Sequence, residues 1–169
     1  MKASLVSNFS IDRKDKKIRV EREFAAPLEK VWAAWTDNEL LDMWWAPKPW
    51  KSITKTMKFK EGGYWHYAMV GPDGTEQFAR ADYLSIIPLE EFRVQDSFTD
   101  AGGNLDKNSP TAIWRVRFSE TVNSTLVHIE IDFKDVSDLD KLIEMDFKEG
   151  FTAGLQNLDE LLSDNTVEF

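Results

Sequence analysis

Five of the seven tryptophans in this chain of 169 residues lie close together, between Trp32 and Trp50. Tryptophan is large and mostly apolar, so such a cluster needs an extensive apolar environment to cover it. Apolar residues around the cluster repeat at helical spacing, first directly after Pro27 and again directly before Pro47. This pattern predicts two short amphipathic helices. Helices this short are not stable alone, so the cluster must pack against a larger structure formed by the rest of the chain.

The remaining segments predict that this larger structure is an antiparallel sheet. From Lys17 to Phe24, apolar and charged residues alternate, as is typical of a half-buried strand. Gly62-Gly63 and the segment from Gly71 to Gly74 suit the tight turns of hairpins. Short links between consecutive strands favour an antiparallel meander. Further strands are expected at about 51–60, 63–70, 76–87, 91–98, 111–120 and 124–133.

A long helix is expected to close the fold, from about Ser137 to Leu162, because apolar residues recur there with helical periodicity. Gly150 and Gly154 lie beside the apolar stripe, where each costs up to about 1 kcal/mol relative to alanine. The pair predicts a close approach at this face, either of the sheet backbone or of a ligand. In the second case, replacing Gly154 by leucine would fill the space and abolish binding.

Length and composition indicate one domain over residues 13–165, preceded by a flexible leader over residues 1–12. The chain has no cysteine, which excludes disulfides, a cysteine nucleophile and thiolate metal sites. Its two histidines form no metal-ligand pattern and no phosphate-binding glycine loop is present, so neither a metal nor a cofactor is expected. A net charge of −9 disfavours binding to nucleic acid. No segment has the composition of a signal peptide or a membrane span, so we expect a cytoplasmic protein.

Several motifs carry a resemblance to a known family. The run from Phe24 to Pro47 resembles the opening of the family named for the activator of heat-shock protein 90 ATPase. The segments Gly62–Gly74, Tyr83–Phe98 and Gly150–Leu158 resemble its later motifs, so the resemblance spans residues 18–163. Each motif is weak alone, but the set is specific.

The resemblance implies an α+β protein of the START-like (SRPBCC) superfamily. In its helix-grip fold, also called Bet v-like, a curved antiparallel sheet wraps around a long C-terminal helix, and two short helices follow the first strand. The resemblance also implies an apolar cavity between the sheet and the long helix, and a possible role in the stress response. The strands and helices expected from periodicity agree with this fold.

The alternation within the predicted strands indicates which side chains line such a cavity. Trp65, Tyr67 and Met69 share one strand face, and Trp114 lies in a second apolar set. Trp50 is a further candidate for the lining. The complete set of expected cavity residues is Trp35, Trp44, Trp65, Tyr67, Met69, Tyr83, Asp96, Trp114, Phe147, Gly150, Phe151 and Gly154.

Two positions within this set leave alternatives. Trp44 and Trp45 are adjacent and point about 100° apart on a helix, so one is expected to pack and the other to lie at the cavity rim. Asp96 is the one acid among apolar residues of its strand face. It either caps a turn or pairs with an arginine near the strand end, or it orients a ligand, with Arg80 and Arg115 as candidate partners.

Three classes of function remain open. The first is a binding protein that holds a small apolar or aromatic ligand in the cavity, without catalysis. The second is a START-like enzyme that acts on a polyketide or aromatic substrate through cavity acids and tyrosines. The third is a co-chaperone-like module, with a chaperone as its partner, because basic residues concentrate in the first 60 residues and acidic ones in the remainder. A monomer and a homodimer are both compatible with the sequence.

Overall fold

One curved antiparallel sheet forms the body of the protein in the computed structural model, which describes residues 5–169. Its strands follow the order β1-β2-β8-β7-β6-β5-β4-β3, so all but one of the neighbouring pairs are consecutive in the chain. The exception places β8 beside β2. The strands are β1 (Ser7–Asp12), β2 (Lys17–Phe24), β3 (Lys51–Met57), β4 (Tyr64–Val70), β5 (Glu76–Ile87), β6 (Glu91–Thr99), β7 (Ala112–Glu120) and β8 (Thr125–Asp132).

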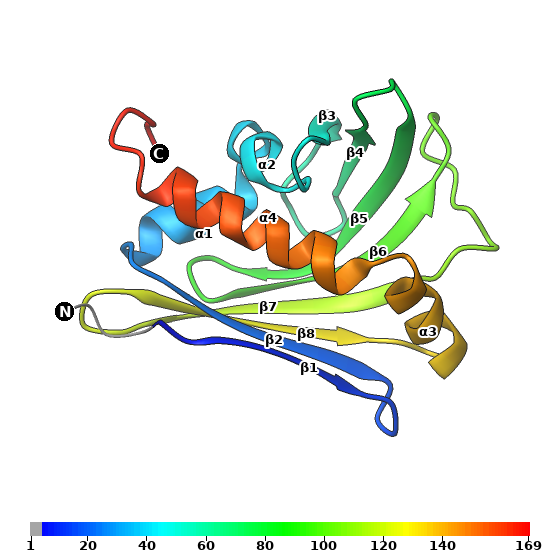
Figure 1. Ribbon diagram of the computed structural model, residues 1–169, viewed down its shortest axis with the longest axis horizontal. Coiled ribbons are helices and arrows are strands. Elements are labelled where there is room, and N and C mark those ends of the chain that lie inside the picture. The colour runs from blue at the N-terminus through cyan, green and yellow to red at the C-terminus, as the bar shows by residue number, and fades with distance from the viewer. Residues whose placement is uncertain (1–4) are drawn as a thin grey trace.

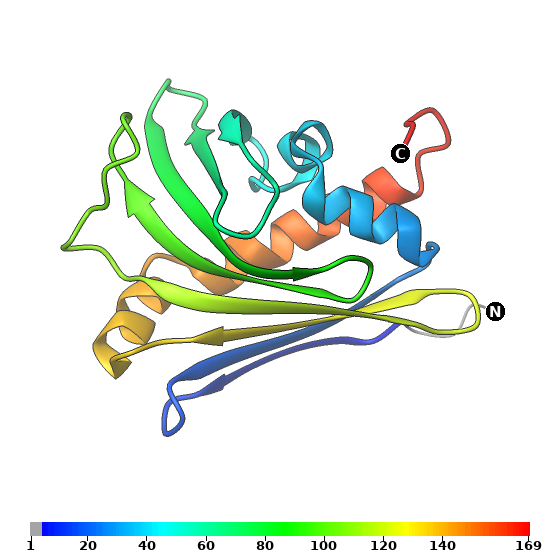
Figure 2. The same cartoon turned by 180° about the vertical axis from the view of Figure 1, so that it is seen from behind.

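Four helices in the described residues cover the concave face of this sheet. Helices α1 (Leu28–Thr36) and α2 (Asn38–Trp44) connect β2 to β3, and α3 (Val136–Glu144) and α4 (Phe147–Leu162) follow β8. The sheet curves around α4, which crosses its concave side (Figure 1). The view from behind shows α1 and α2 beside the same helix (Figure 2). The predicted α+β helix-grip architecture is therefore confirmed. In the described part of the chain, no helix has the length and apolar character needed to cross a membrane.

The tryptophan cluster holds the two short helices on the sheet. Trp35 and Trp44 pack edge to face with ring centroids 4.8 Å apart, and Trp44 donates its indole N–H to the carbonyl of Ala34 at 2.8 Å. Trp32 packs at 5.1 Å against Phe118 of β7. Edge-to-face aromatic pairs add about 0.5–1.5 kcal/mol each beyond the area they bury. The helices thus depend on the sheet, as their length predicts.

The flexible leader expected over residues 1–12 is wrong for its second half. Ser7–Asp12 form strand β1, which pairs with β2 from Ser7 opposite Arg22 to Asp12 opposite Lys17. Residues 1–4 lie outside the described residues. Strand β1 shows little apolar alternation because most of its side chains are exposed. Backbone hydrogen bonds to β2 hold it, and Phe9 adds a ring contact with Phe147 of α4, with the two centroids 6.3 Å apart.

The single long helix expected from Ser137 to Leu162 is in fact two helices. The break falls at Asp146, whose backbone adopts the left-handed conformation with φ 60° and ψ 36°. Asp and Asn enter this region more readily than most other residues. The apolar stripe continues across the break because both helices bury one face in the same core. Periodicity alone therefore conceals the change of direction that Figure 1 shows between α3 and α4.

Gly154 allows α4 to approach the end of α2. A Cβ atom at this position would lie 3.1 Å from the carbonyl oxygen of Trp45 and 3.5 Å from that of Trp44. Gly150 differs, because a Cβ there would meet only Pro47, at an ordinary 3.8 Å. The close approach predicted from the two glycines is therefore present at Gly154. The group that approaches is the backbone at the end of α2, not a ligand. The expectation that leucine at this position would fill a ligand cavity is wrong.

The two glycines should consequently respond in opposite ways to alanine. Gly150→Ala should raise the free energy of unfolding by up to about 1 kcal/mol, because helix propensity improves without a clash. Gly154→Ala should lower it by about 1–2 kcal/mol, because the new methyl group presses on backbone carbonyls that cannot turn away. Urea unfolding of both variants tests this. Equal effects at the two positions would contradict the close approach.

Candidate functional site

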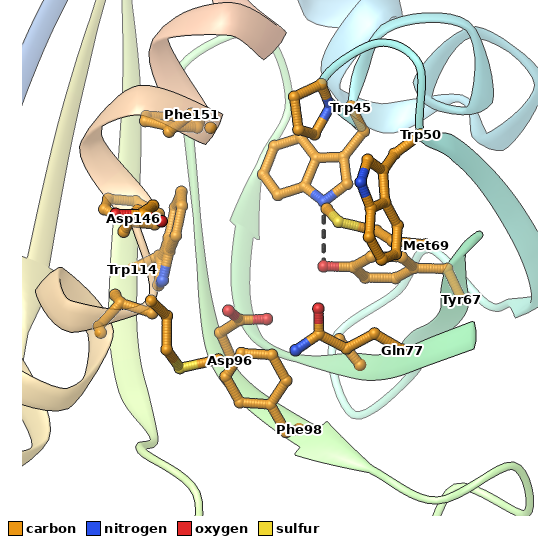
Figure 3. Close-up of a pocket in the computed structure, with 16 residues that line it drawn as sticks. Trp45, Trp50, Tyr67, Met69, Gln77, Asp96, Phe98, Trp114, Asp146 and Phe151 are labelled. Atoms are coloured by element: carbon orange, nitrogen blue, oxygen red, sulfur yellow. Dashed lines mark hydrogen bonds between the residues drawn. The ribbon is translucent and has the colours of Figure 1, made fainter. Parts of the chain in front are cut away.

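A cleft of about 430 Å³ lies between the concave face of the sheet and the helices α3 and α4. Strands β4 to β7 supply its floor, and the segment after α2 supplies one side (Figure 3). The lining residues are Trp45, Pro47, Trp50, Tyr67, Met69, Gln77, Ala79, Asp96, Phe98, Trp114, Leu142, Met145, Asp146, Phe147, Gly150 and Phe151. The lining is thus mainly aromatic and apolar.

Aromatic rings that pack on one another form the walls of the cleft. Phe147 and Phe151 stack at 5.2 Å on α4, and Phe151 meets Trp114 of β7 edge to face at 5.4 Å. The ring centroid of Trp45 lies 5.9 Å from that of Trp114 and 6.0 Å from that of Phe151. Because each of these four rings contacts at least one other, this part of the wall is fixed before any ligand arrives.

Trp45 is also fixed by a hydrogen bond. Its indole N–H donates to the hydroxyl oxygen of Tyr67 at 3.0 Å, drawn as the dashed line in Figure 3. Burial, and then the charge of Asp96, raises the pKa of Tyr67 well above its ordinary value, so its hydroxyl keeps its proton. Trp44, in contrast, is only 1% exposed and packs in the core. One of the two adjacent tryptophans thus packs and the other lines the cleft, but the expected cavity set named Trp44 where the structure places Trp45.

Asp96 lies on the floor of the cleft, on β6, and its carboxyl group forms no hydrogen bond with any residue that the structure describes. Burial, and to a lesser extent the negative charge of Asp82 on the neighbouring strand, raises its pKa to about 7. A carboxyl group in this state is neutral in part of the population near neutral pH. It can therefore either donate or accept a hydrogen bond.

The expected pairing of Asp96 with an arginine is wrong. Arg80 donates to Asp82 at 2.7 Å, and Arg115 donates to Glu91 at 2.7 Å. Along β5, Arg80 alternates with the inward-facing Ala79, so its side chain extends from the opposite face of the sheet from the cleft. Asp96 therefore faces the cleft without a compensating cation.

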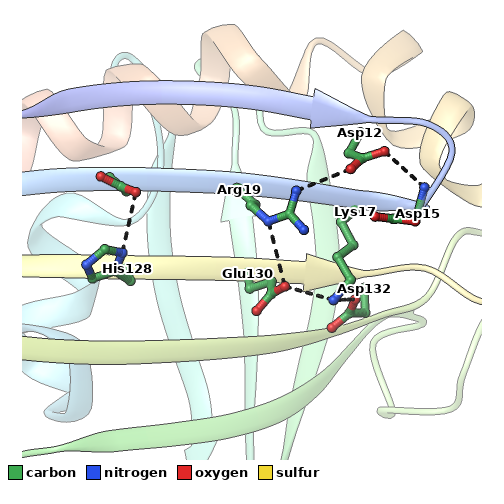
Figure 4. Close-up of polar contacts among 8 residues, drawn as sticks. Asp12, Asp15, Lys17, Arg19, His128, Glu130 and Asp132 are labelled. Carbon is green, nitrogen blue, oxygen red and sulfur yellow. Dashed lines mark hydrogen bonds and ion pairs between the residues drawn. The ribbon is translucent and has the colours of Figure 1, made fainter.

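Other ionisable groups pair outside the cleft. On β2 and β8, Lys17 contacts Glu130 at 2.8 Å and Asp132 at 3.1 Å, and Arg19 lies 3.4 Å from Asp12 (Figure 4). The hydrogen bond from Lys17 lowers the pKa of Glu130. Pairs of this kind on a solvated face contribute little stability.

The expected cavity residues fall into three groups in the structure. Seven line the cleft: Tyr67, Met69, Asp96, Trp114, Phe147, Gly150 and Phe151. Trp35, Trp65 and Tyr83 instead surround a deeper void of about 30 Å³, which Asp96 and Trp114 also touch. Trp44 and Gly154 line neither space, because Trp44 fills the core between the short helices and Gly154 contacts backbone.

Several lining residues were absent from the expected set. Gln77 and Ala79 share a strand face with Tyr83, so extending the alternation along β5 would have found them. Leu142 and Met145 could not be found in this way, because they reach the cleft from α3 only after the chain turns at Asp146. The other missed residues are Trp45, Pro47, Phe98 and Asp146, while Trp50 was already a candidate.

Comparison with known proteins gives a family and a fold. The model of the family described as Activator of Hsp90 ATPase homolog 1-like protein matches residues 25–163. The structure resembles the solution structure of a protein from Arthrobacter aurescens, with 28% identity, a TM-score of 0.87 and coverage of 92% of this chain and 91% of that one. A protein from Staphylococcus epidermidis matches at 27% identity, with a TM-score of 0.80 and coverage of 95% and 96%. The crystal structure of a Mycobacterium smegmatis protein, 22% identical, has a TM-score of 0.87 with coverage of 98% and 100% and supports the fold alone. No curated protein matches the sequence.

The state of Asp96 predicts a stability difference that depends on pH. Its pKa rises from 3.8 to about 7 on folding. The contribution of this group to the free energy of unfolding is therefore complete below pH 4 and is lost as the pH rises through 7. Asp96→Asn removes the ionisation, so at pH 8 it should be more stable than the parent by about 1–2 kcal/mol, since the side chain keeps some contact with solvent.

At pH 4 the two proteins should have nearly the same free energy of unfolding. Urea unfolding at both values measures the difference, and other titrating groups cancel because both proteins contain them. A variant that is less stable than the parent at pH 8 would show that the carboxylate has a favourable partner.

Proposed function

The chain belongs to the family of Activator of Hsp90 ATPase homolog 1-like proteins, and from this premise we propose that it is a non-catalytic binding protein for a small hydrophobic ligand. The ligand occupies the cleft between the sheet and α4. The observation that carries the proposal is the cleft itself, because its volume of about 430 Å³ lies within the usual range for small-molecule sites.

The chemistry of the lining supports an apolar and partly flat ligand. Trp45, Trp114 and Phe151 contact one another and together present one continuous aromatic surface to the cleft. A ligand that loses about 200 Å² of apolar surface to such walls gains on the order of 5 kcal/mol before the costs of association.

The rigidity of the walls supports the same conclusion. The hydrogen bond between Trp45 and Tyr67, together with the stack of Phe147 on Phe151, holds rings that would otherwise have to be ordered on binding. Immobilising a side chain at a binding site costs about 0.5–1.5 kcal/mol. These rings are already ordered in the free protein, so binding does not carry this cost.

Native mass spectrometry of the purified protein is the direct test of this function. We expect a discrete apolar molecule that co-purifies with the protein and that solvent extraction releases and identifies. The second readout is calorimetric titration with 2-naphthylmethanol, a neutral aromatic probe that fits the cleft. A protein that carries no molecule and does not bind this probe would contradict the proposal.

A pair of neighbouring substitutions tests where the ligand binds. Gln77 lines the cleft and Glu76 precedes it on the opposite face of β5, and both are exposed. Gln77→Trp should weaken binding of 2-naphthylmethanol by about tenfold or more, because the indole occupies part of the cleft. Glu76→Trp, the matched control, should leave the affinity unchanged. Equal effects of the two substitutions would place the ligand elsewhere.

A further inference from the structure

The charged residues of the cleft all have the same sign. Among the described residues that line it, Asp96 and Asp146 are the ionisable ones with acidic side chains, and no lysine, arginine or histidine is present. Asp96 comes from the sheet, whereas Asp146 comes from the start of α4 on the opposite side (Figure 3). The two carboxyl groups therefore face the cleft from different elements.

Three cations near the cleft form ion pairs away from it. Arg80 and Arg115 form ion pairs with Asp82 and Glu91. Lys48, next to Pro47 at the rim, lies 3.2 Å from Glu160. A buried carboxylate is ordinarily paired with a cation. Among the described residues that line the cleft, no cation pairs with Asp96.

The walls of the cleft favour the same sign of ligand charge. The face of an aromatic ring carries partial negative charge, and tryptophan attracts cations more strongly than the other aromatic side chains. Trp45, Trp50 and Trp114 all line the cleft, with the rings of Phe147 and Phe151 beside them. Aromatic side chains around a carboxylate are the arrangement by which proteins hold organic ammonium groups.

We propose that the cleft selects a ligand with a positively charged amine or quaternary ammonium group attached to an apolar, aromatic body. The ammonium group lies beside Asp96 and against the aromatic surface that Trp45 and Trp114 form, and the apolar body lies along Trp114 and Phe151. This inference rests on the proposed function and adds to it the chemical class of the ligand. It excludes fatty acids and other carboxylates as preferred ligands, because their charge would face two acids and no cation.

Three probes of similar size and different charge test this inference. They are 2-naphthylmethylamine, which is protonated at pH 7.5, the neutral 2-naphthylmethanol and the anionic 2-naphthoate. In calorimetric titrations we expect the amine to bind about tenfold or more tighter than the alcohol, and the carboxylate to bind more weakly than either.

Variants of the two acids show which group is responsible. Asp96→Asn should reduce the preference for the amine over the alcohol to about threefold or less, with the affinity for the alcohol retained. Asp146→Asn, which tolerates the same left-handed backbone, should reduce the preference by a smaller factor. The matched control is Asp132→Asn, which removes one negative charge from the face of β8 away from the cleft and should change the amine affinity by less than about twofold.

The outcomes separate this inference from the function on which it rests. If the alcohol binds as tightly as the amine, or the carboxylate binds best, the cleft holds apolar ligands and the selection for a cation is wrong. If the amine is preferred equally in the parent and in Asp96→Asn, the selection does not arise from this site. If none of the three probes binds and no molecule co-purifies, both proposals fail.

Discussion

The contact between Gly154 and the end of α2 determines much of the structure. Since Gly154 has no side chain, α4 lies directly on the carbonyl groups of Trp44 and Trp45. This contact holds the end of α2, and with it the two tryptophans, against α4. Trp44 turns into the core, where its N–H reaches Ala34, and Trp45 turns toward Tyr67. One wall of the cleft thus follows from a backbone contact that lies outside it.

The cleft remains open because the same chain breaks between α3 and α4. If the helix were continuous, α3 and α4 would share one axis. The left-handed backbone at Asp146 instead changes the direction of the chain between them. Leu142 and Met145 then close one end of the cleft from α3, while Phe147 and Phe151 face it from α4. The site is therefore assembled from three independent parts: the sheet, the segment after α2, and the joint between the last two helices.

The features that were predictable from the sequence are those that depend on local periodicity. The alternation from Lys17 to Phe24 and the turns at Gly62 and Gly71 were sufficient for the strands, and adjacency was sufficient for the different roles of Trp44 and Trp45. Strand β1 was missed because most of its side chains are exposed, and Phe9 and Ile11 alone form too short an apolar alternation. The pairing of Asp96 with Arg80 was wrong because the two side chains, although on neighbouring strands, lie on opposite faces of the sheet. The break at Asp146 was not predicted because an apolar stripe can continue across two helices that pack on the same core.

The contacts among the tryptophans have an optical consequence. Trp35, Trp44, Trp45, Trp65 and Trp114 form a continuous chain of ring contacts, with neighbouring centroids between 4.8 and 5.9 Å apart. At such separations excitation passes between indoles faster than it is emitted, so these rings fluoresce as one group rather than as separate chromophores. Contact with Trp45 or Trp114 at the cleft would then quench the emission of residues buried in the core. The fold thereby contains an intrinsic reporter of occupancy that needs no added label.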